Sequence, residues 1–343
     1  LSYLFFNPNH SIDKAQFCVL VTKGEREMKK IIPAVLIIVF CACIFGSAAA
    51  DDSIAEGGVW GILVPNISRN TYYASCISGV TKAIEELDPT ATYIIAECDN
   101  DSTKQLDQMA DMIQQNVKAI IAIPWGSSGL ISGVTEAKDA GIPVFLVDTP
   151  LNDLKNVTST IVSDNFSAGV IAGEGLTEEL PDGGKIVTLM TTGSEAINQR
   201  AAGMHSIIDD TKIEVAQDLV LNTGTVEEAM TQVENAILAI PDLKGIFTTG
   251  DVFADAAVSA LKANGVKKGE IVIVSVDGNA KGCELIEDGW VYSTSAQQTV
   301  KMGYDSVVNA LAFLDGEKIE DYIELPCLKI TKEVLEAGEY EPF

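Results

Sequence analysis

The chain has 343 residues, of which 49 are acidic and 23 are basic, and its formal net charge at pH 7 is −26. A field of that sign repels nucleic acid, so the composition argues against a nucleic-acid-binding function. The length is too great for one small core, and we expect two domains of ordinary size.

The N-terminal region carries the three parts of an export signal. Met28 begins a short positive segment, an apolar run follows over residues 31–45, and small residues end at Ala50. We therefore expect a signal peptide over 28–50 that is removed after its last alanine. Residues 1–27 are interpreted as upstream sequence translated in error.

The apolar run is short for a membrane-spanning helix, which needs about 20 apolar residues. A retained anchor is the lesser alternative, and lipid attachment at Cys43 stays open because such signals are loosely defined. We expect an exported protein, located in the periplasm or at the cell surface, free or membrane-anchored.

From residue 58 onward, apolar strand-like runs alternate with helix-like stretches. The first series predicts strands at 59–64, 92–97, 119–123 and 144–148, and helices at 73–87, 103–116 and 128–140. Because each strand run is almost entirely apolar, we expect parallel strands buried on both faces between crossover helices. The first half thus predicts a doubly wound α/β lobe.

A second series repeats the same pattern. It predicts strands at 159–164, 185–190, 214–220, 245–250, 271–277 and 291–297, with helices at 166–180, 195–210, 226–239, 253–264 and 280–288. The fold class expected is therefore α/β, with two similar doubly wound parallel-sheet lobes.

Polar and aromatic side chains gather where the predicted strands end. In open parallel sheets, ligands bind beyond the carboxyl ends of the strands. Carboxylates accept hydroxyl hydrogens, amides both donate and accept, and aromatic faces pack against the C–H surface of a sugar ring. Each residue alone is explained by a turn, a cap or packing, so their joint occurrence carries the prediction. The residues are Asn66, Asn70, Tyr72, Tyr73, Asp148 and Asp277.

Seven motifs stand in order at these strand ends. They are residues 69–73, 141–144 leading into Asp148, 162–165, 200–203, 247–251, 276–278 and 296–297. In these motifs the chain resembles the type I periplasmic binding proteins of ribose- and galactose-like sugars, which deliver ligand to ABC importers. The resemblance covers residues 51–343 almost completely.

The resemblance implies a binding cleft between the two lobes. Its first-lobe residues would be Asn66, Asn70, Tyr72, Tyr73 and Asp148, and its second-lobe and hinge residues Arg200, Asp277 and Gln297. The ligand would contact both lobes only when they close. A monomer that delivers a mono- or small saccharide to an ABC permease and ATPase is then expected, with no cofactor and no metal.

The resemblance also implies a hinge of three strands. Crossings between lobes are expected near Ser163, Gln297 and Cys327. The N-terminal lobe would comprise 57–162 with 298–326, and the C-terminal lobe 163–297 with 327–343.

Three positions depart from the ribose-type pattern. Thr149 stands where arginine is expected, Gly250 where asparagine is expected, and Gly224 where an aromatic residue usually covers the ligand. Each change removes a contact or bulk, so we expect a roomier pocket with fewer donors. Such a pocket disfavours ribose and favours a different pentose, a hexose, a larger glycoside or another polar metabolite. Trp125, after the third strand, is a further candidate for stacking on the ligand.

Other functions are weighed against this interpretation. The expected mature chain has one histidine, His205, in a predicted helix, and no motif of a hydrolase, zinc protease, nucleotide-binding loop or dinucleotide fold, so we expect no catalysis. A sugar-responsive repressor would need a basic helix-turn-helix where the export signal stands. A subunit that feeds a chemosensory or signalling receptor, with a ligand that need not be a sugar, stays an alternative.

Four cysteines follow the expected cleavage site: Cys76, Cys98, Cys283 and Cys327. In an exported chain they permit two disulfides in any of three pairings, and four free buried thiols are an equal alternative. Four matches to the Asn-x-Ser/Thr pattern leave glycosylation open, because the motif is too common to decide.

Overall fold

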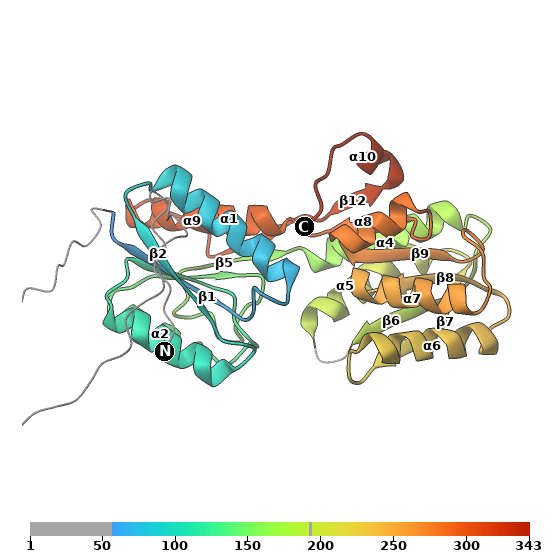
Figure 1. Ribbon diagram of the computed structural model, residues 1–343, viewed down its shortest axis with the longest axis horizontal. Coiled ribbons are helices and arrows are strands. Elements are labelled where there is room, and N and C mark those ends of the chain that lie inside the picture. Colours follow the sequence, from blue (N-terminus) through green and yellow to red (C-terminus); the bar gives the residue numbers. More distant parts are fainter. Residues whose placement is uncertain (1–56, 192–193) are drawn as a thin grey trace, which may run out of the picture. The chain divides into compact units, whose positions relative to one another are not determined.

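A computed structural model describes residues 57–191 and 194–343 of the chain (Figure 1). The expected signal peptide at 28–50 and the alternative lipid attachment at Cys43 lie outside the described residues. In the described part, no helix combines the length and the apolar character needed to cross a bilayer.

The first sheet has six strands that pair in parallel throughout. Its spatial order is β11-β5-β4-β3-β1-β2. The strands are β1 (Val59–Val64), β2 (Thr92–Glu97), β3 (Ala119–Ala122), β4 (Val144–Val147), β5 (Ser159–Ser163) and β11 (Tyr322–Leu325). Every residue of β3 and β4 is buried, as their all-apolar sequences predict for strands covered on both faces.

The second sheet repeats this arrangement in the order β12-β10-β9-β8-β6-β7. Its strands are β6 (Gly184–Thr191), β7 (Ile213–Leu221), β8 (Leu243–Thr248), β9 (Val272–Asp277), β10 (Ser293–Ala296) and β12 (Leu328–Thr331). Only the edge strand β12 pairs antiparallel. Strands β4 and β9 therefore occupy equivalent positions in the two sheets, as do β1 and β6.

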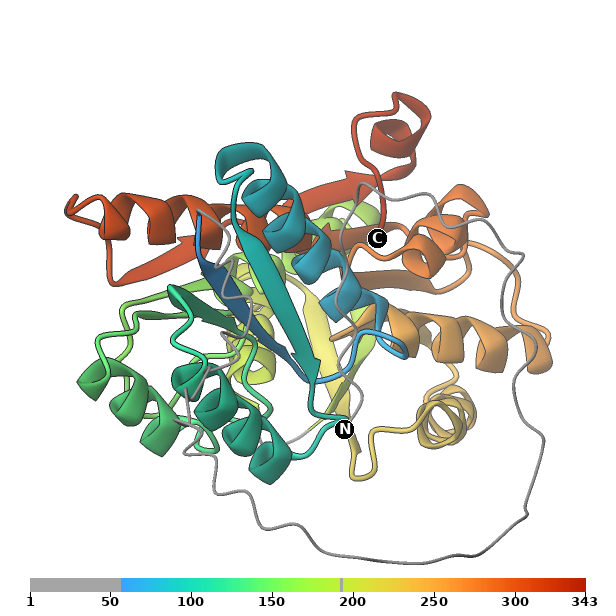
Figure 2. The same ribbon diagram turned by 60° about the vertical axis from the view of Figure 1, so that its left-hand side comes forward.

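Helices cover both faces of each sheet. On the first sheet, α1 (Thr71–Leu87) and α9 (Thr299–Leu314) pack on one face, and α2 (Ser102–Gln114) and α3 (Ile131–Asp139) pack on the other (Figure 2). On the second, α4 (Asn165–Glu179) and α5 (Glu195–Ile208) lie opposite α6 (Val226–Ala239), α7 (Asp251–Ala263) and α8 (Ala280–Glu287). The short helix α10 (Lys332–Glu336) follows β12.

Two helix pairs approach each other so closely that only glycine fits at the crossing. A Cβ at Gly303 of α9 would lie 1.9 Å from the carbonyl oxygen of Cys76 in α1. In the second sheet's layer, a Cβ at Gly169 of α4 would lie 1.9 Å from the carbonyl oxygen of Arg200 in α5. In each lobe, a glycine therefore lets the helix that follows the hinge, α9 or α4, pack closely against α1 or α5.

The chain passes between the two sheets at three places, after β5, after β10 and between β11 and β12. The crossings are bonded to one another. Gln298 Nε2 donates to the carbonyl oxygen of Pro326 at 2.7 Å, and the amide of Cys327 donates to Ser167 Oγ at 3.3 Å. These bonds hold the three segments together as one hinge.

All four cysteines of the described residues are buried and unpaired, so the free-thiol alternative describes Cys76, Cys98, Cys283 and Cys327.

Candidate functional site

Two aspartates occupy equivalent strand ends with left-handed backbone conformations. Asp148 follows β4 and has φ 68°, and Asp277 ends β9 and has φ 126°. A non-glycine residue in such a conformation costs on the order of 1–3 kcal/mol and persists mainly where the surroundings enforce it, often at functional sites. The same strain at the same place in both sheets marks these strand ends as a candidate site.

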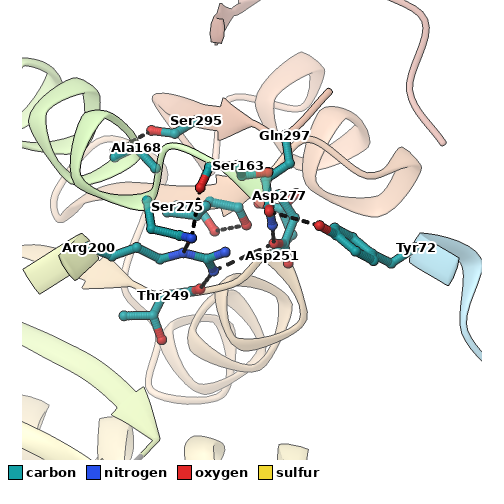
Figure 3. Close-up of polar contacts among 12 residues, drawn as sticks. Tyr72, Ser163, Ala168, Arg200, Thr249, Asp251, Ser275, Asp277, Ser295 and Gln297 are labelled. Atoms are coloured by element: carbon teal, nitrogen blue, oxygen red, sulfur yellow. Dashed lines mark hydrogen bonds and ion pairs between the residues drawn. The ribbon is translucent and has the colours of Figure 1, made fainter. Parts of the chain in front are cut away.

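A series of short polar contacts joins the two aspartates, and Figure 3 shows the part that runs from Tyr72 through Gln297 to Asp277. The Tyr72 hydroxyl donates to Asp148 Oδ1 at 2.6 Å, and its oxygen lies 2.9 Å from Gln297 Oε1. Gln297 Nε2 then donates to Asp277 Oδ1 at 2.7 Å. The series runs from the first sheet through the hinge to the second, so it crosses the junction of the lobes.

Arg200 approaches the same point from α5. Its Nη1 lies 3.7 Å from Asp277 Oδ1, and only 8% of the residue is exposed. Two further bonds fix the guanidinium: Nε donates to Asn165 Oδ1 at 2.8 Å, and Nη1 donates to the carbonyl oxygen of Thr249 at 2.6 Å. Asn165 is itself held, because its Nδ2 donates to the carbonyl oxygen of Ser163 at 3.0 Å.

Asp251 supports the turn that carries Asp277. It is fully buried at the start of α7, and its Oδ2 accepts from the amides of Gly278 at 2.8 Å and Asn279 at 2.9 Å. Its Oδ1 accepts from Thr294 Oγ1 at 2.8 Å. Burial, and then the charge of Asp277, raise the pKa of Asp251 to about 7. This carboxyl group therefore fixes the ligand-side turn without facing the cleft itself.

Burial also controls the ionisation of the other groups. It raises the pKa of Asp148 against the lowering effect of bonds from Tyr72 and Thr149. It raises the pKa of Asp277 against the charge of Arg200, although 22% of the Asp277 side chain is exposed. Carboxylates withheld from water in this way gain much from a new hydrogen-bond donor.

Of the other first-lobe residues predicted from the sequence, one packs against Tyr72 and two bond within their own turns. Tyr73 is the packing residue, with its ring centroid 5.8 Å from that of Tyr72. Asn66 is buried and accepts from the Arg69 amide at 2.9 Å, whereas Asn70 is an exposed N-cap of α1. In the described structure both amides therefore serve their local turns.

Trp125 lies on the loop after β3 with 39% of the residue exposed, and its amide donates to Gln105 Oε1 at 2.8 Å. His205 lies on α5 and pairs with Asp209 at 2.9 Å. No group of three or more histidine, cysteine or acidic residues in the described parts of the chain is placed to hold a metal ion.

Sequence reasoning missed several supporting residues. Asn165 and Asp251 lie within the motifs 162–165 and 247–251, but neither was predicted as a site residue. The available signal for Asp251 was its position as an acidic residue in the first turn of a helix that follows a buried strand. Thr149 was treated only as a lost arginine, whereas its hydroxyl donates to Asp148 Oδ2 at 2.9 Å. The contact that Thr249 makes uses its backbone carbonyl, which no side-chain pattern reveals.

Comparisons with known proteins find relatives along most of the chain. Residues 60–318 match the family described as periplasmic binding protein domain. The chain is 29% identical over 259 residues to the ribose import binding protein of Bacillus subtilis, covering 75% of this chain and 82% of that protein. It is 33% identical over 220 residues to a D-apiose import binding protein of Paraburkholderia graminis, covering 63% and 69%.

Solved structures show the same architecture. A periplasmic solute binding protein of an ABC transporter from Actinobacillus succinogenes, with bound D-allose, matches with a TM-score of 0.74 at 23% identity, covering 82% of this chain and 99% of that one. A periplasmic ribose ABC transporter protein from Conexibacter woesei matches with a TM-score of 0.76 at 20% identity, covering 82% and 93%. The predicted fold of two doubly wound α/β lobes is confirmed.

Proposed function

The chain belongs to the periplasmic binding protein family, and from that premise we propose that it captures a sugar between its lobes and delivers it to an ABC importer. One observation carries the proposal: side chains from both lobes and from the hinge come together in one polar series, made by Tyr72, Asp148, Gln297, Asp277 and Arg200. Acceptors, a phenol and a guanidinium close together suit a polyhydroxylated ligand, which both donates and accepts.

We propose that these five residues contact the ligand, with Asn66, Asn70, Tyr73 and Trp125 around them. Ligand contacts made to both lobes exist only in the closed form, so binding stabilises closure by those differential contacts. A closed form with a bound sugar is what a permease would recognise. The curated relatives described above are named import binding proteins, which supports import in preference to sensing.

The ligand we propose is a pentose or hexose other than ribose. A Cβ at Gly250 would lie 3.2 Å from Asp277 Oδ2, so the glycine leaves space beside that carboxylate where an asparagine would stand. The Thr149 hydroxyl is occupied by Asp148 and replaces a longer donor. The glycine favours a ligand with a substituent directed toward Asp277, and the threonine leaves one donor fewer beside Asp148.

We further propose that the protein acts as an exported monomer without catalytic activity. His205 lies on α5 with 41% of its side chain exposed, and it pairs with the exposed Asp209 at the end of that helix. It belongs to no polar series that would serve a nucleophile. Family membership supports export to the periplasm.

A thermal-shift screen of the purified protein against D-ribose, D-apiose, D-allose, L-arabinose and myo-inositol tests the proposal. A ligand that binds only the folded state stabilises it by about 2.7 kcal/mol at a hundredfold excess over Kd. Arg200→Ala and Asp277→Asn should abolish the shift, whereas Asp288→Asn at the exposed end of α8 should keep it. Equal shifts in all variants, or none with any sugar, would contradict sugar capture at this site.

A further inference from the structure

The segment after α10 returns to the turn that follows Asp277. Tyr340 Oη donates to the carbonyl oxygen of Gly278 at 2.7 Å, and the carbonyl oxygen of Phe343 accepts from the amide of Ala280 at 2.9 Å. Residues 340–343, here called the tail, are thus bonded at both ends to the turn 278–280. The turn and the tail therefore form one unit on the second sheet.

Gly278 permits this close approach. Its φ is +81°, and a Cβ there would lie 2.5 Å from Tyr340 Oη and 2.4 Å from the Cβ of Ala296. Any side chain at this position would push the tail away from the turn. The sequence of the turn and the position of the tail are accordingly matched.

The tail also reaches a residue of the first lobe. The Phe343 ring lies 5.7 Å from the Tyr72 ring, centroid to centroid, at an interplanar angle of 81°. Tyr72 also meets Tyr73 in a second edge-to-face contact at 5.8 Å and 85°. Edge-to-face pairs at such distances are attractive and directional, so the two neighbours hold the Tyr72 ring in place.

The hydroxyl oxygen lies on the axis of the ring, so its position depends on how the whole side chain is turned about the Cα–Cβ bond. This oxygen is 2.6 Å from Asp148 Oδ1 and 2.9 Å from Gln297 Oε1, and a modest swing of the ring about that bond would disturb both contacts. Tyr73 belongs to the same helix as Tyr72, whereas Phe343 is anchored to the second-lobe turn beside Asp277. Phe343 is therefore the neighbour that relates the two lobes.

We propose that Phe343 is a positioning residue of the cleft, which orients the Tyr72 hydroxyl and ties helix α1 of the first lobe to the turn 278–280 of the second. The tail thereby contributes to ligand affinity without supplying a polar group to the ligand.

A double-mutant cycle tests the positioning role. Phe343→Ala should weaken sugar binding by about threefold to tenfold, the range expected for one lost aromatic pair. In a Tyr72→Phe background, which lacks the hydroxyl to be oriented, the same change should alter Kd by less than about twofold. Phe343→Tyr retains the ring and should restore binding.

Phe313→Ala is the matched control. Phe313 lies on α9, and its ring meets that of Phe145 edge to face at 6.1 Å and 75°. This pair includes no residue of the polar series. The effect of Phe313→Ala on Kd should be small and the same in both backgrounds. Additive effects of Phe343→Ala and Tyr72→Phe would overturn the proposal.

The binding measurement rests on the proposed sugar capture, so a ligand-free measurement accompanies it. Hydrogen exchange of the unliganded protein should be faster in the first turns of α1 and in the turn 278–280 for Phe343→Ala, normal for Phe343→Tyr, and unchanged there for Phe313→Ala. If no sugar binds and these exchange changes appear, the function fails and the tail contact stands. Unchanged exchange in Phe343→Ala would refute the tail contact whatever the ligand.

Discussion

Replacing Asp251 by asparagine should remove a pH-dependent cost to folding. The carboxyl group is fully buried, and its pKa is raised to about 7 by burial and by the neighbouring Asp277. A carboxyl whose folded-state pKa lies above its unfolded value stabilises the fold when protonated. That contribution is complete below the unfolded pKa near 4 and is lost as the pH rises through the folded value.

The size of the effect follows from the shift. One pKa unit corresponds to 1.36 kcal/mol, so a shift from 3.8 to about 7 corresponds to about 4 kcal/mol when the pH is well above 7. Between pH 5 and pH 8 the free energy of unfolding should fall by up to about 3 kcal/mol from this group. Since Asp277 contributes to the shift of Asp251, this figure is the upper limit for this one site.

Asparagine keeps the geometry and removes the charge. Its Oδ1 still accepts from the amides of Gly278 and Asn279, and its Nδ2 meets the Thr294 hydroxyl, which accepts as readily as it donates. We therefore expect the stability of Asp251→Asn relative to the wild type to increase from pH 5 to pH 8.

Urea denaturation of both proteins at pH 5, 6, 7 and 8 measures this difference. Asp255→Asn is the control, since it lies on the same helix with 42% of its side chain exposed, and its difference from the wild type should not change with pH. A constant penalty for Asp251→Asn at every pH would show that the carboxylate is needed ionised, and would refute the reasoning.

Three further outcomes are expected. Tyr72→Phe should weaken sugar binding about fivefold to tenfold in calorimetry, because it removes one hydrogen bond from a buried carboxylate, and an unchanged Kd would exclude the hydroxyl from the site. Gly303→Ala should lower the free energy of unfolding by about 2 kcal/mol or more, because its Cβ would meet the Cys76 carbonyl oxygen at 1.9 Å; a change below about 0.5 kcal/mol would mean that α1 and α9 separate easily. Sugar binding should release protons and tighten as the pH rises from 5 to 7, because ligand hydroxyls donate to ionised carboxylates whose pKa values burial has raised in the free protein. Calorimetry in buffers of different ionisation enthalpy measures the release, and net uptake would contradict it.

The strands could be predicted from the sequence because both sheets are covered on both faces. Runs such as 119–123 and 144–148 are almost wholly apolar, and the structure forms β3 and β4 there. The expected elements stopped at residue 297, so α9 and α10 were not predicted, and neither were the strands β11 and β12. Each of these strands has four residues, lies at an edge of its sheet and buries only one residue fully, which leaves little hydrophobic signal.

The site was predicted less completely, for a different reason. Strand ends pointed to Asp148 and Asp277, since the residue type and the edge of the sheet are both readable from sequence. The 2.9 Å approach of Tyr72 to Gln297, residues 225 positions apart, depends on how the hinge brings the sheets together. The role of Phe343 depends on where a short irregular segment returns, and neither periodicity nor composition encodes that return.

Hydrogen counting along the polar series gives a reason for a ligand hydroxyl at its centre. The phenol of Tyr72 has one hydrogen, so it can satisfy Asp148 or Gln297 Oε1 but not both. If the Gln297 amide is flipped, its Nε2 donates to the Tyr72 oxygen, but its Oε1 then faces Asp277 Oδ1. In either orientation two acceptor oxygens face each other without a hydrogen between them, unless a proton is bound within the series. With that proton, two carboxylates and the Arg200 guanidinium sum to zero charge. A sugar hydroxyl placed between the lobes supplies the missing hydrogen-bond donor, so the bound proton is no longer needed. We therefore expect the protein to release that proton when it captures the sugar.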